Sequence, residues 1–259
     1  PSYLYLQNMK KFILSIDQGT TSSRVSLYDS KFNKVDSIQK EFKQYFPEDG
    51  WVEHDALEIW YDVKKLLSKL LRKNKLSSTQ ILSIGIANQR ETTVLWNKKN
   101  GRPINRAIVW QDRRTSSLCN NLKKKGLGKK FQEITGLIID PYFSATKIKW
   151  ILDKNKISKR LIQNNNLLFG TIDTWLLWNL TQGKSHLTDI TNASRTMLFD
   201  AQKNQWSKYL LKSLNIPISI LPQVVDNVYD FGETNLFGES IKIGGMAGDQ
   251  QAATIGQAC

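Results

Sequence analysis

The sequence predicts an α/β fold in which a mixed β-sheet is flanked by helices. Short apolar runs of strand length, such as residues 12–16 and 81–87, alternate along the chain with longer segments whose apolar residues recur at helical spacing. Glycine and asparagine separate most of these segments. With 259 residues, of which 40% are hydrophobic, the chain can bury a large core.

The first elements are expected to form an antiparallel meander. Residues 12–16 and 24–28 are strand-like, and residues 34–42 continue the alternation of apolar and polar side chains. The octet D-Q-G-T-T-S-S-R at 17–24 joins the first two strands. We therefore expect this octet at the tip of a hairpin.

A long amphipathic helix follows the meander. Asp55 and Glu58 have the spacing of a capping box, and apolar residues at helical spacing continue to about Asn74. One face of this helix should lie on the sheet. Further strands are expected at 81–87, 92–96 and 106–110, and further helices at 114–125, 145–152, 173–180 and 206–214.

The last segment combines a Gly-rich strand end with another helix. The stretch I-G-G-M-A-G-D-Q-Q-A-A at 243–253 places Asp249 at the expected N-cap of that helix. The helix dipole favours an ionised carboxylate at this position. Asp249 is therefore a candidate for chemistry that needs a carboxylate, although a plain cap is the alternative.

Composition argues against several classes of protein. The formal net charge of +14 comes largely from scattered lysines, which favours solvated helix faces over a nucleic-acid groove. Two cysteines and two histidines cannot supply a disulfide framework or a zinc cluster, so any metal would have oxygen ligands. No apolar run approaches the roughly 18 residues of a membrane span, and a cytoplasmic protein is expected. Residues 1–10 are expected to be a disordered leader.

The octet has the composition of an anion site. Gly19 allows the backbone to approach a ligand closely, neighbouring hydroxyls can donate hydrogen bonds, and Arg24 can offset negative charge. Phosphate is the natural ligand, and Asp17 could hold Mg²⁺ bridging to the phosphate oxygens. The alternative is a polar β-turn without a ligand. The candidate phosphate-binding residues are Thr20, Thr21, Ser22 and Arg24.

A second polar cluster suits a polyol. Arg90 and Glu91 follow the buried strand, and together they can donate to and accept from hydroxyl groups, although a surface ion pair is the alternative. Trp110 and Tyr142 stand beside polar residues and could form apolar walls, unless they are core residues. Asp249 could orient an attacking hydroxyl and accept its proton in phosphoryl transfer.

Eight motifs in order resemble those of the FGGY carbohydrate kinases, and among these the members that act on glycerol. The motifs are D-Q-G-T-T-S-S-R (17–24), G-W-V-E-H-D (50–55), N-Q-R-E-T-T (88–93), V-W-Q-D-R-R-T (109–115), I-D-P-Y-F-S (139–144), F-G-T-I-D-T-W (169–175), T-N-A-S-R-T-M-L (191–198) and A-G-D-Q-Q-A-A (247–253). Each motif alone is weak. Eight of them in the same order, across residues 12–259, are specific.

The resemblance implies a fold of the actin, hexokinase and Hsp70 type, which is ribonuclease H-like, with two related domains around ATP and substrate. Residues 11–259 would be the N-terminal domain, and the C-terminal nucleotide domain is expected to be absent from this chain. The implied nucleotide-phosphate contacts are Thr20, Thr21, Ser22 and Arg24, with Asp17 serving Mg²⁺. The implied glycerol pocket is Arg90, Glu91, Trp110, Tyr142, Asp249 and Gln250, with Asp249 as general base.

The resemblance implies ATP-dependent phosphorylation of glycerol to sn-glycerol 3-phosphate in glycerol catabolism. Two alternatives stay open: an FGGY kinase for another polyol or a pentulose, and an inactive polyol-binding fragment of a truncated gene. The expected small-molecule partners are glycerol and ATP. No nucleic-acid partner and no membrane span are expected, and a homo-oligomer is compatible with the sequence.

Overall fold

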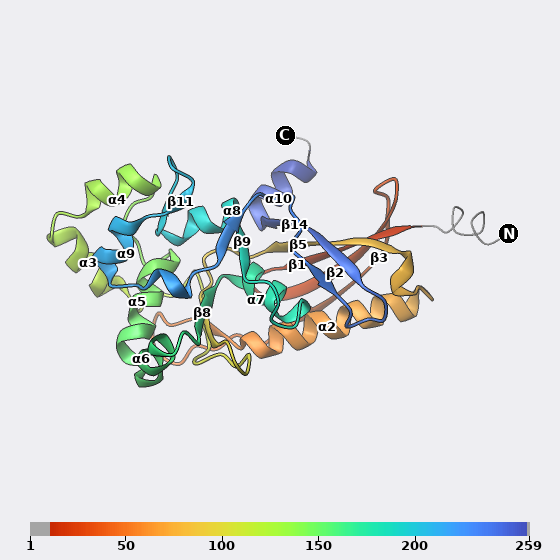
Figure 1. Cartoon of the computed structure of the whole chain (residues 1–259), viewed down its shortest axis with the longest axis horizontal. Helices are drawn as coiled ribbons and strands as arrows, with labels where there is room; N and C mark the ends of the chain where they lie inside the picture. The colour runs from red at the N-terminus through yellow and green to blue at the C-terminus, as the bar shows by residue number, and fades with distance from the viewer. Residues whose placement is uncertain (1–10, 258–259) are drawn as a thin grey trace.

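The centre of the structure is a six-stranded mixed β-sheet (Figure 1). A computed structural model describes residues 11–257, so the leader expected at residues 1–10 lies outside the described residues. The strands of the sheet are β1 (Phe12–Gln18), β2 (Ser22–Asp29), β3 (Lys34–Glu41), β5 (Ile81–Asn88), β13 (Glu233–Thr234) and β14 (Ile241–Gly248). Their order is β13–β14–β5–β1–β2–β3, and the predicted α/β class with a mixed sheet is confirmed.

The middle of the sheet is parallel and its outer strands are antiparallel. β14 and β1 both run parallel to β5, whereas β2, β3 and β13 pair antiparallel with their neighbours. The predicted meander is therefore confirmed, and the octet lies at the tip of the β1–β2 hairpin. Asn88 is in register with both Gln18 and Gly248, so β1, β5 and β14 end at the same edge. Residues that follow these strands must meet there.

Helices lie on both sides of the sheet. In Figure 1, α2 (Ala56–Lys73) and α7 (Ile172–Leu180) lie below the sheet, and α10 (Asp249–Gly256) lies above it. α2 begins where the sequence predicts, because the carboxylate of Asp55 accepts two backbone N–H groups of the first turn. The cap sets the start of α2, and the apolar face of the helix packs against the sheet.

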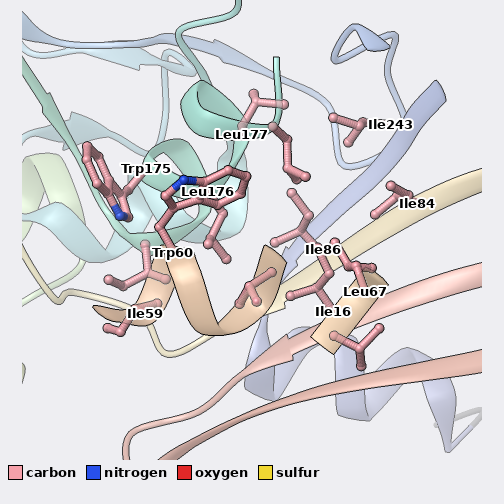
Figure 2. Close-up of a cluster of buried hydrophobic side chains, with 14 of the residues drawn as sticks. Ile16, Ile59, Trp60, Leu67, Ile84, Ile86, Trp175, Leu176, Leu177 and Ile243 are labelled. Carbon is pink, nitrogen blue, oxygen red and sulfur yellow. The ribbon is translucent and has the colours of Figure 1, made fainter. Parts of the chain in front are cut away.

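A hydrophobic core between α2, α7 and the sheet fixes the strands. The side chains labelled in Figure 2 come from these helices and from β1, β5 and β14: Ile16, Ile59, Trp60, Leu67, Ile84, Ile86, Trp175, Leu176, Leu177 and Ile243. All of them are buried. Burying an apolar side chain of this size stabilises the fold by about 1.5–3 kcal/mol. The core therefore holds rigid the three strands whose ends carry the polar clusters.

A second core lies in a helical lobe beside the sheet, at the left in Figure 1. The helices of this lobe are α3 (Ser116–Lys124), α4 (Gly128–Thr135), α5 (Ser144–Lys154), α6 (Lys156–Gln163) and α9 (Lys208–Leu214). Phe131, Ile148 and Leu210 are among the buried side chains that they share. Within residues 11–257, no helix has both the length and the apolar character needed to span a membrane.

Two predicted strands are shorter than expected and lie outside the central sheet. β6 (Val94–Asn97) pairs with β8 (Leu167–Gly170), and β7 (Ala107–Ile108) pairs with β4 (Glu53–His54). The chain leaves the sheet after β5, where Glu91 has a φ of 63°. The remaining elements are β9 (Leu187–Asp189), β10 (Phe199–Asp200), β11 (Gln205–Trp206), β12 (Gln223–Val225), α8 (Ile190–Ala193), η1 (Ser78–Gln80), η2 (Ser194–Thr196) and η3 (Ile218–Ile220).

His186 is an uncharged member of the packed interior. Its ring lies edge-on to those of Trp96 and Trp178, and its Nε2 lies 2.8 Å from the carbonyl oxygen of Phe169. Burial lowers the pKa of His186 to about 4. Between pH 6.5 and 4, the unfolded chain therefore binds a proton that the folded chain does not, and acidification lowers the free energy of unfolding.

We predict that His186→Phe flattens this pH dependence, because phenylalanine preserves the ring packing and cannot titrate. Between pH 6.5 and 4.5, the free energy of unfolding of the variant should rise by about 2 kcal/mol relative to that of the parent. Urea unfolding at both pH values measures the difference. The contributions of the other titrating groups to the free energy of unfolding are common to both proteins and largely cancel. A parallel loss of stability in the two proteins would contradict the prediction.

Candidate functional site

The candidate site lies at the edge where β1, β5 and β14 end. Asp17 lies near the end of β1, Arg90 and Glu91 follow β5, and Asp249 follows β14. Burial raises the pKa of Asp17, and the negative charge of Asp249 raises it further, whereas the guanidinium of Arg24 opposes the shift. The two carboxylates are thus close enough to affect each other. The structure thus places the predicted anion-binding turn and the predicted acid at the same edge of the sheet.

Two hydroxyls of the hairpin turn are held with their protons free to donate. The indole Nε1 of Trp110 donates to Thr20 Oγ1 over 3.0 Å, and the amide of Gln39 donates to Ser22 Oγ over 2.8 Å. Because each hydroxyl already accepts a hydrogen bond, its own proton is available for another acceptor. Gln39 also accepts from Arg24 over 2.8 Å, which fixes the guanidinium beside the turn.

The carbonyl groups of the turn are anchored by a buried polar network. Gln89 donates to the carbonyl of Gly19 over 3.0 Å, and Gln44 donates to the carbonyl of Thr20 over 3.0 Å. His54 Nε2 lies 2.6 Å from Gln44 Oε1, and its Nδ1 lies 3.3 Å from the amide nitrogen of Gln89. Burial lowers the pKa of His54 to about 4, so it stays neutral. A network whose members are all satisfied holds the turn in one conformation.

Arg90 and Asp249 form the centre of the site. Arg90 Nε lies 3.4 Å from Asp249 Oδ1, and the arginine side chain is only 5% exposed. This buried nitrogen has no hydrogen-bond acceptor among the described residues, whereas Arg90 Nη1 donates to Gln251 over 3.2 Å. Gly248 permits the close approach, because a Cβ there would lie 2.4 Å from Arg90 Cδ. A guanidinium held in this way can donate to a ligand beside Asp249.

The sequence predicts Asp249 as the N-cap of α10, and this prediction is wrong. Gly248 is the N-cap, and Asp249 is the first helical residue. The reason is that β14 extends to Gly248, so the helix begins directly at its end. Asp249 Oδ1 accepts the backbone N–H of Gln250 over 2.8 Å. The carboxylate therefore stays in the first turn of the helix, where the dipole favours its charge.

Glu91 is a buried carboxylate with a defined cation partner. Arg195 Nε donates to Glu91 Oε1 over 2.6 Å. Burial raises the pKa of Glu91, and the hydrogen bond and charge of Arg195 oppose the shift. The positive φ of Glu91 is unusual for a side chain of this size, and such conformations persist where the surroundings impose them.

An aromatic wall lies beside Glu91. The rings of Trp110 and Tyr142 are 5.4 Å apart, and the guanidinium of Arg195 lies over the Tyr142 ring at 5.6 Å. The buried ammonium of Lys147 donates to the carbonyls of Pro141 and Tyr142. Burial lowers the pKa of Lys147 to about 7. These contacts hold Tyr142 against Trp110, so the two rings form one apolar surface.

Most of the predicted residues therefore meet at one edge of the sheet. Thr21 and Gln250 also lie in the turn and in α10, but both are exposed. Side chains that contact the site and that sequence reasoning missed include Gln39, Gln44, Arg195 and Gln251. Arg195 belongs to the T-N-A-S-R-T-M-L motif, which contributed to the family resemblance but assigned no role to Arg195. No sequence pattern indicated Gln39, because its contact with Arg24 depends on the register between β2 and β3.

The carboxylates at this edge fit an ion that is shared with a ligand. Among residues 11–257, no cluster of three or more His, Cys, Asp or Glu could hold a metal ion by itself. Mg²⁺ usually takes one or two carboxylates together with water and phosphate oxygens. Asp17 and Asp249 supply such a pair of carboxylates beside the hydroxyls of the turn.

Sequence comparisons identify what the chain is similar to. A family described as "FGGY family of carbohydrate kinases, N-terminal domain" matches residues 12–256. Glycerol kinase of Treponema denticola is 55% identical over 254 residues, which are 97% of this chain and 51% of the relative. Glycerol kinase of Petrotoga mobilis is 52% identical, with coverage of 97% and 51%. The chain thus spans about half the length of these curated relatives.

Solved structures of other proteins have a fold similar to that of this chain. Plasmodium falciparum glycerol kinase with ADP matches with a TM-score of 0.91 and 38% identity, covering 96% of this chain and 50% of that one. Gluconate kinase from Lactobacillus acidophilus has a TM-score of 0.84 at 24% identity, covering 95% and 50%, which shows the fold alone. The predicted actin, hexokinase and Hsp70 type of fold is confirmed.

We predict that Gly248→Ala displaces Arg90 and destabilises the protein by about 1–3 kcal/mol, because the new methyl group would overlap the arginine side chain. Gly85→Ala on the neighbouring strand is the matched control, since its Cβ would meet no atom within 4 Å. Urea unfolding and crystal structures of both variants measure the effect. Equal stabilities, with Arg90 still beside Asp249 in the Gly248 variant, would refute the steric explanation.

Proposed function

The chain belongs to the FGGY family of carbohydrate kinases, and from this premise we propose that it serves the ATP-dependent phosphorylation of glycerol to sn-glycerol 3-phosphate. One observation carries the proposal: the Arg90–Asp249 pair lies at the same edge of the sheet as Asp17 and the hydroxyl-lined turn. An acceptor hydroxyl and a phosphoryl donor could meet between these two groups. The glycerol kinases at 52–55% identity support the choice of substrate.

The polyol would bind on the Arg90 side. Arg90 can donate to hydroxyl oxygens and Glu91 can accept hydroxyl protons, so together they match the two roles of an alcohol group. Trp110 and Tyr142 would cover the carbon chain of glycerol. The charge of Glu91 is already offset by Arg195, so a neutral polyol suits this pocket better than an anionic sugar acid. Gln250 would join from the first turn of α10.

The nucleotide phosphates would bind at the hairpin turn. Thr20 and Ser22 have hydroxyl protons available because their oxygens accept from Trp110 and Gln39. Thr21 is exposed at the turn, and Arg24 supplies positive charge. The related Plasmodium falciparum glycerol kinase was solved with ADP, which supports a nucleotide as the phosphoryl donor.

Mg²⁺ is proposed at Asp17, with Asp249 nearby. When bound, the ion would neutralise negative charge that develops on the phosphate oxygens. Arg24 limits the rise in the pKa of Asp17 that burial and Asp249 cause, and so favours the ionised carboxylate that a metal ligand requires.

Asp249 is proposed as the general base. It would orient the terminal hydroxyl of glycerol and accept its proton as the new oxygen–phosphorus bond forms and the bond to ADP breaks. Arg90 holds the carboxylate from one side and the backbone N–H of Gln250 holds it from another. The guanidinium of Arg90 and the N–H of Gln250 thus both lie at Asp249 Oδ1, which orients the carboxylate for this role.

A coupled assay of ADP release tests this function. It compares glycerol, xylulose and gluconate, using this chain alone and this chain joined to the C-terminal half of the Treponema denticola glycerol kinase. We expect glycerol-dependent release of ADP in the joined protein. Preference for xylulose or gluconate would contradict the choice of glycerol. Absence of turnover in both forms would favour a polyol-binding fragment. Cytoplasmic location and homo-oligomer formation stay predictions of the sequence.

Asp249→Asn should remove the base while preserving the shape of the side chain. We predict a loss of about 10²–10⁴-fold in kcat, with the dissociation constant of glycerol changed only slightly. The control is Asp153→Asn, which alters an exposed carboxylate that pairs with Lys149 on α5. Steady-state kinetics and calorimetry of glycerol binding provide the measurements. Turnover of Asp249→Asn within tenfold of the parent would exclude the role of base.

Arg90→Ala and Arg24→Ala should separate the two halves of the site. Loss of charged hydrogen bonds worth about 1.5–3 kcal/mol should raise KM for the ligand on that side by roughly 10–100-fold. We expect Arg90→Ala to raise KM for glycerol more than KM for ATP, and Arg24→Ala to do the opposite. Both constants are measured for both variants in the coupled assay. The reverse order would exchange the two assignments.

A further inference from the structure

A buried cluster outside the proposed pocket is built around Asp189, at the end of β9. The carboxylate accepts four hydrogen bonds, from Thr191 N at 2.6 Å, Thr191 Oγ1 at 2.5 Å, Asn192 Nδ2 at 2.6 Å and Asn227 Nδ2 at 2.8 Å. Asp189 is fully buried. Its bond with Thr191 N caps the single turn of α8, and its other three hydrogen bonds are additional to that cap.

One branch of the cluster reaches the end of β14. The backbone N–H of Gly248, directly before Asp249, donates to Thr191 Oγ1 over 2.8 Å. Thr191 can accept this bond because its own proton goes to Asp189. The side-chain amide of Asn227 donates to the carbonyl of Met246 over 2.9 Å, and the main-chain carbonyl of Asn227 accepts the N–H of Met246 over 2.9 Å. The last residues of β14 are therefore tied to Asp189 through two side chains.

The other branch reaches the end of β5. Asn192 and Asn88 exchange two side-chain hydrogen bonds, of 2.9 and 3.0 Å. Asn88 also donates to the carbonyl of Gln89, which precedes Arg90, over 2.9 Å. Asn88 and Asn192 are both fully buried. The same carboxylate thus fixes the backbone leading into Arg90 and the backbone leading into Asp249.

We propose that Thr191 and Asn192, held by Asp189, are positioning residues that set the distance between Asp249 and Arg90 for phosphoryl transfer. This inference rests on the proposed function. None of the three side chains needs to contact a substrate. Thr191 and Asn192 bond to Gly248 and Asn88, which lie within two residues of Asp249 and Arg90, and Asp189 acts through Thr191 and Asn192. Reaction rates are sensitive to such placement, and a shift of about 1 Å can lower turnover by about 10²-fold.

Thr191 offers the sharpest test, because a single hydroxyl joins Asp189 to Gly248. Thr191→Val preserves the shape of the side chain and removes both hydrogen bonds, whereas Thr191→Ser preserves the hydroxyl. Thr135 is a matched control in the helical lobe. It is buried, its hydroxyl donates to the carbonyl of Phe131 over 2.8 Å, and it accepts the N–H of Leu137 over 3.0 Å. Thr135→Val therefore removes the same pair of bonds far from the site.

The experiment measures kcat and both KM values of these variants in whichever form of the protein is active with glycerol. We expect Thr191→Val to lower kcat by roughly 10–100-fold while KM for glycerol and ATP changes by less than about threefold. Thr191→Ser should restore kcat to within about threefold of the parent. Thr135→Val should lower thermal stability without lowering kcat at a temperature where it is folded.

A kcat of Thr191→Val within threefold of that of Thr135→Val would overturn the inference, as would failure of a folded Thr191→Ser to restore turnover. Crystal structures give a readout that is independent of activity: Arg90 Nε and Asp249 Oδ1 should lie farther apart in Thr191→Val than the 3.4 Å of the parent. The two proposals fail separately. Absence of turnover in the parent contradicts the function, whereas an unchanged separation in Thr191→Val contradicts the positioning role.

Discussion

The parallel pairing of β5 with both β1 and β14 is the constraint on which the site depends. Parallel strands end at the same edge of a sheet, so Asp17, Arg90 and Asp249 meet although they are far apart in the sequence. A slip of one residue would turn every side chain of the slipped strand to the opposite face and bury its polar residues in the core. The core formed by α2 and α7 therefore specifies the geometry of the site as well as the stability of the fold.

The charged groups at this edge are arranged at a cost in stability. Removing charges from water is unfavourable, and the attraction within a buried pair repays that cost only with good geometry and further hydrogen bonds. Glu91 is buried against Arg195, and Arg90 is buried with one nitrogen unsatisfied. Hydrophobic residues of similar size would stabilise this region at least as well. A donor and an acceptor retained beside an aromatic wall are more easily explained by recognition of hydroxyl groups than by folding.

Local patterns predicted the elements and the candidate residues, but not the contacts that connect them. The hairpin, the cap at Asp55 and the apolar face of α2 follow from periods and turn residues over a few positions. In contrast, Gln39 reaches Arg24 only because of the register between two strands, and Arg195 reaches Glu91 across 104 positions. The N-cap at Gly248 was missed because the length of β14 is set by its pairing with β5. Such features depend on tertiary structure, which one sequence does not specify at the level of single residues.

The exposure of the proposed reacting groups bears on what the described residues could do by themselves. The side chains of Asp17, Arg24 and Asp249 are 48%, 49% and 42% exposed, so water reaches the proposed phosphate and base positions. Phosphoryl transfer benefits from exclusion of water, which strengthens the interactions with the transferring group and prevents loss of the phosphoryl group to water. Arg90 and Glu91, in contrast, are already buried by the described residues alone. Recognition of the proposed polyol should therefore depend mainly on these residues, whereas the proposed turnover should depend on what covers the open edge. The relatives are about twice as long as this chain, so they contain additional residues that could cover such an edge.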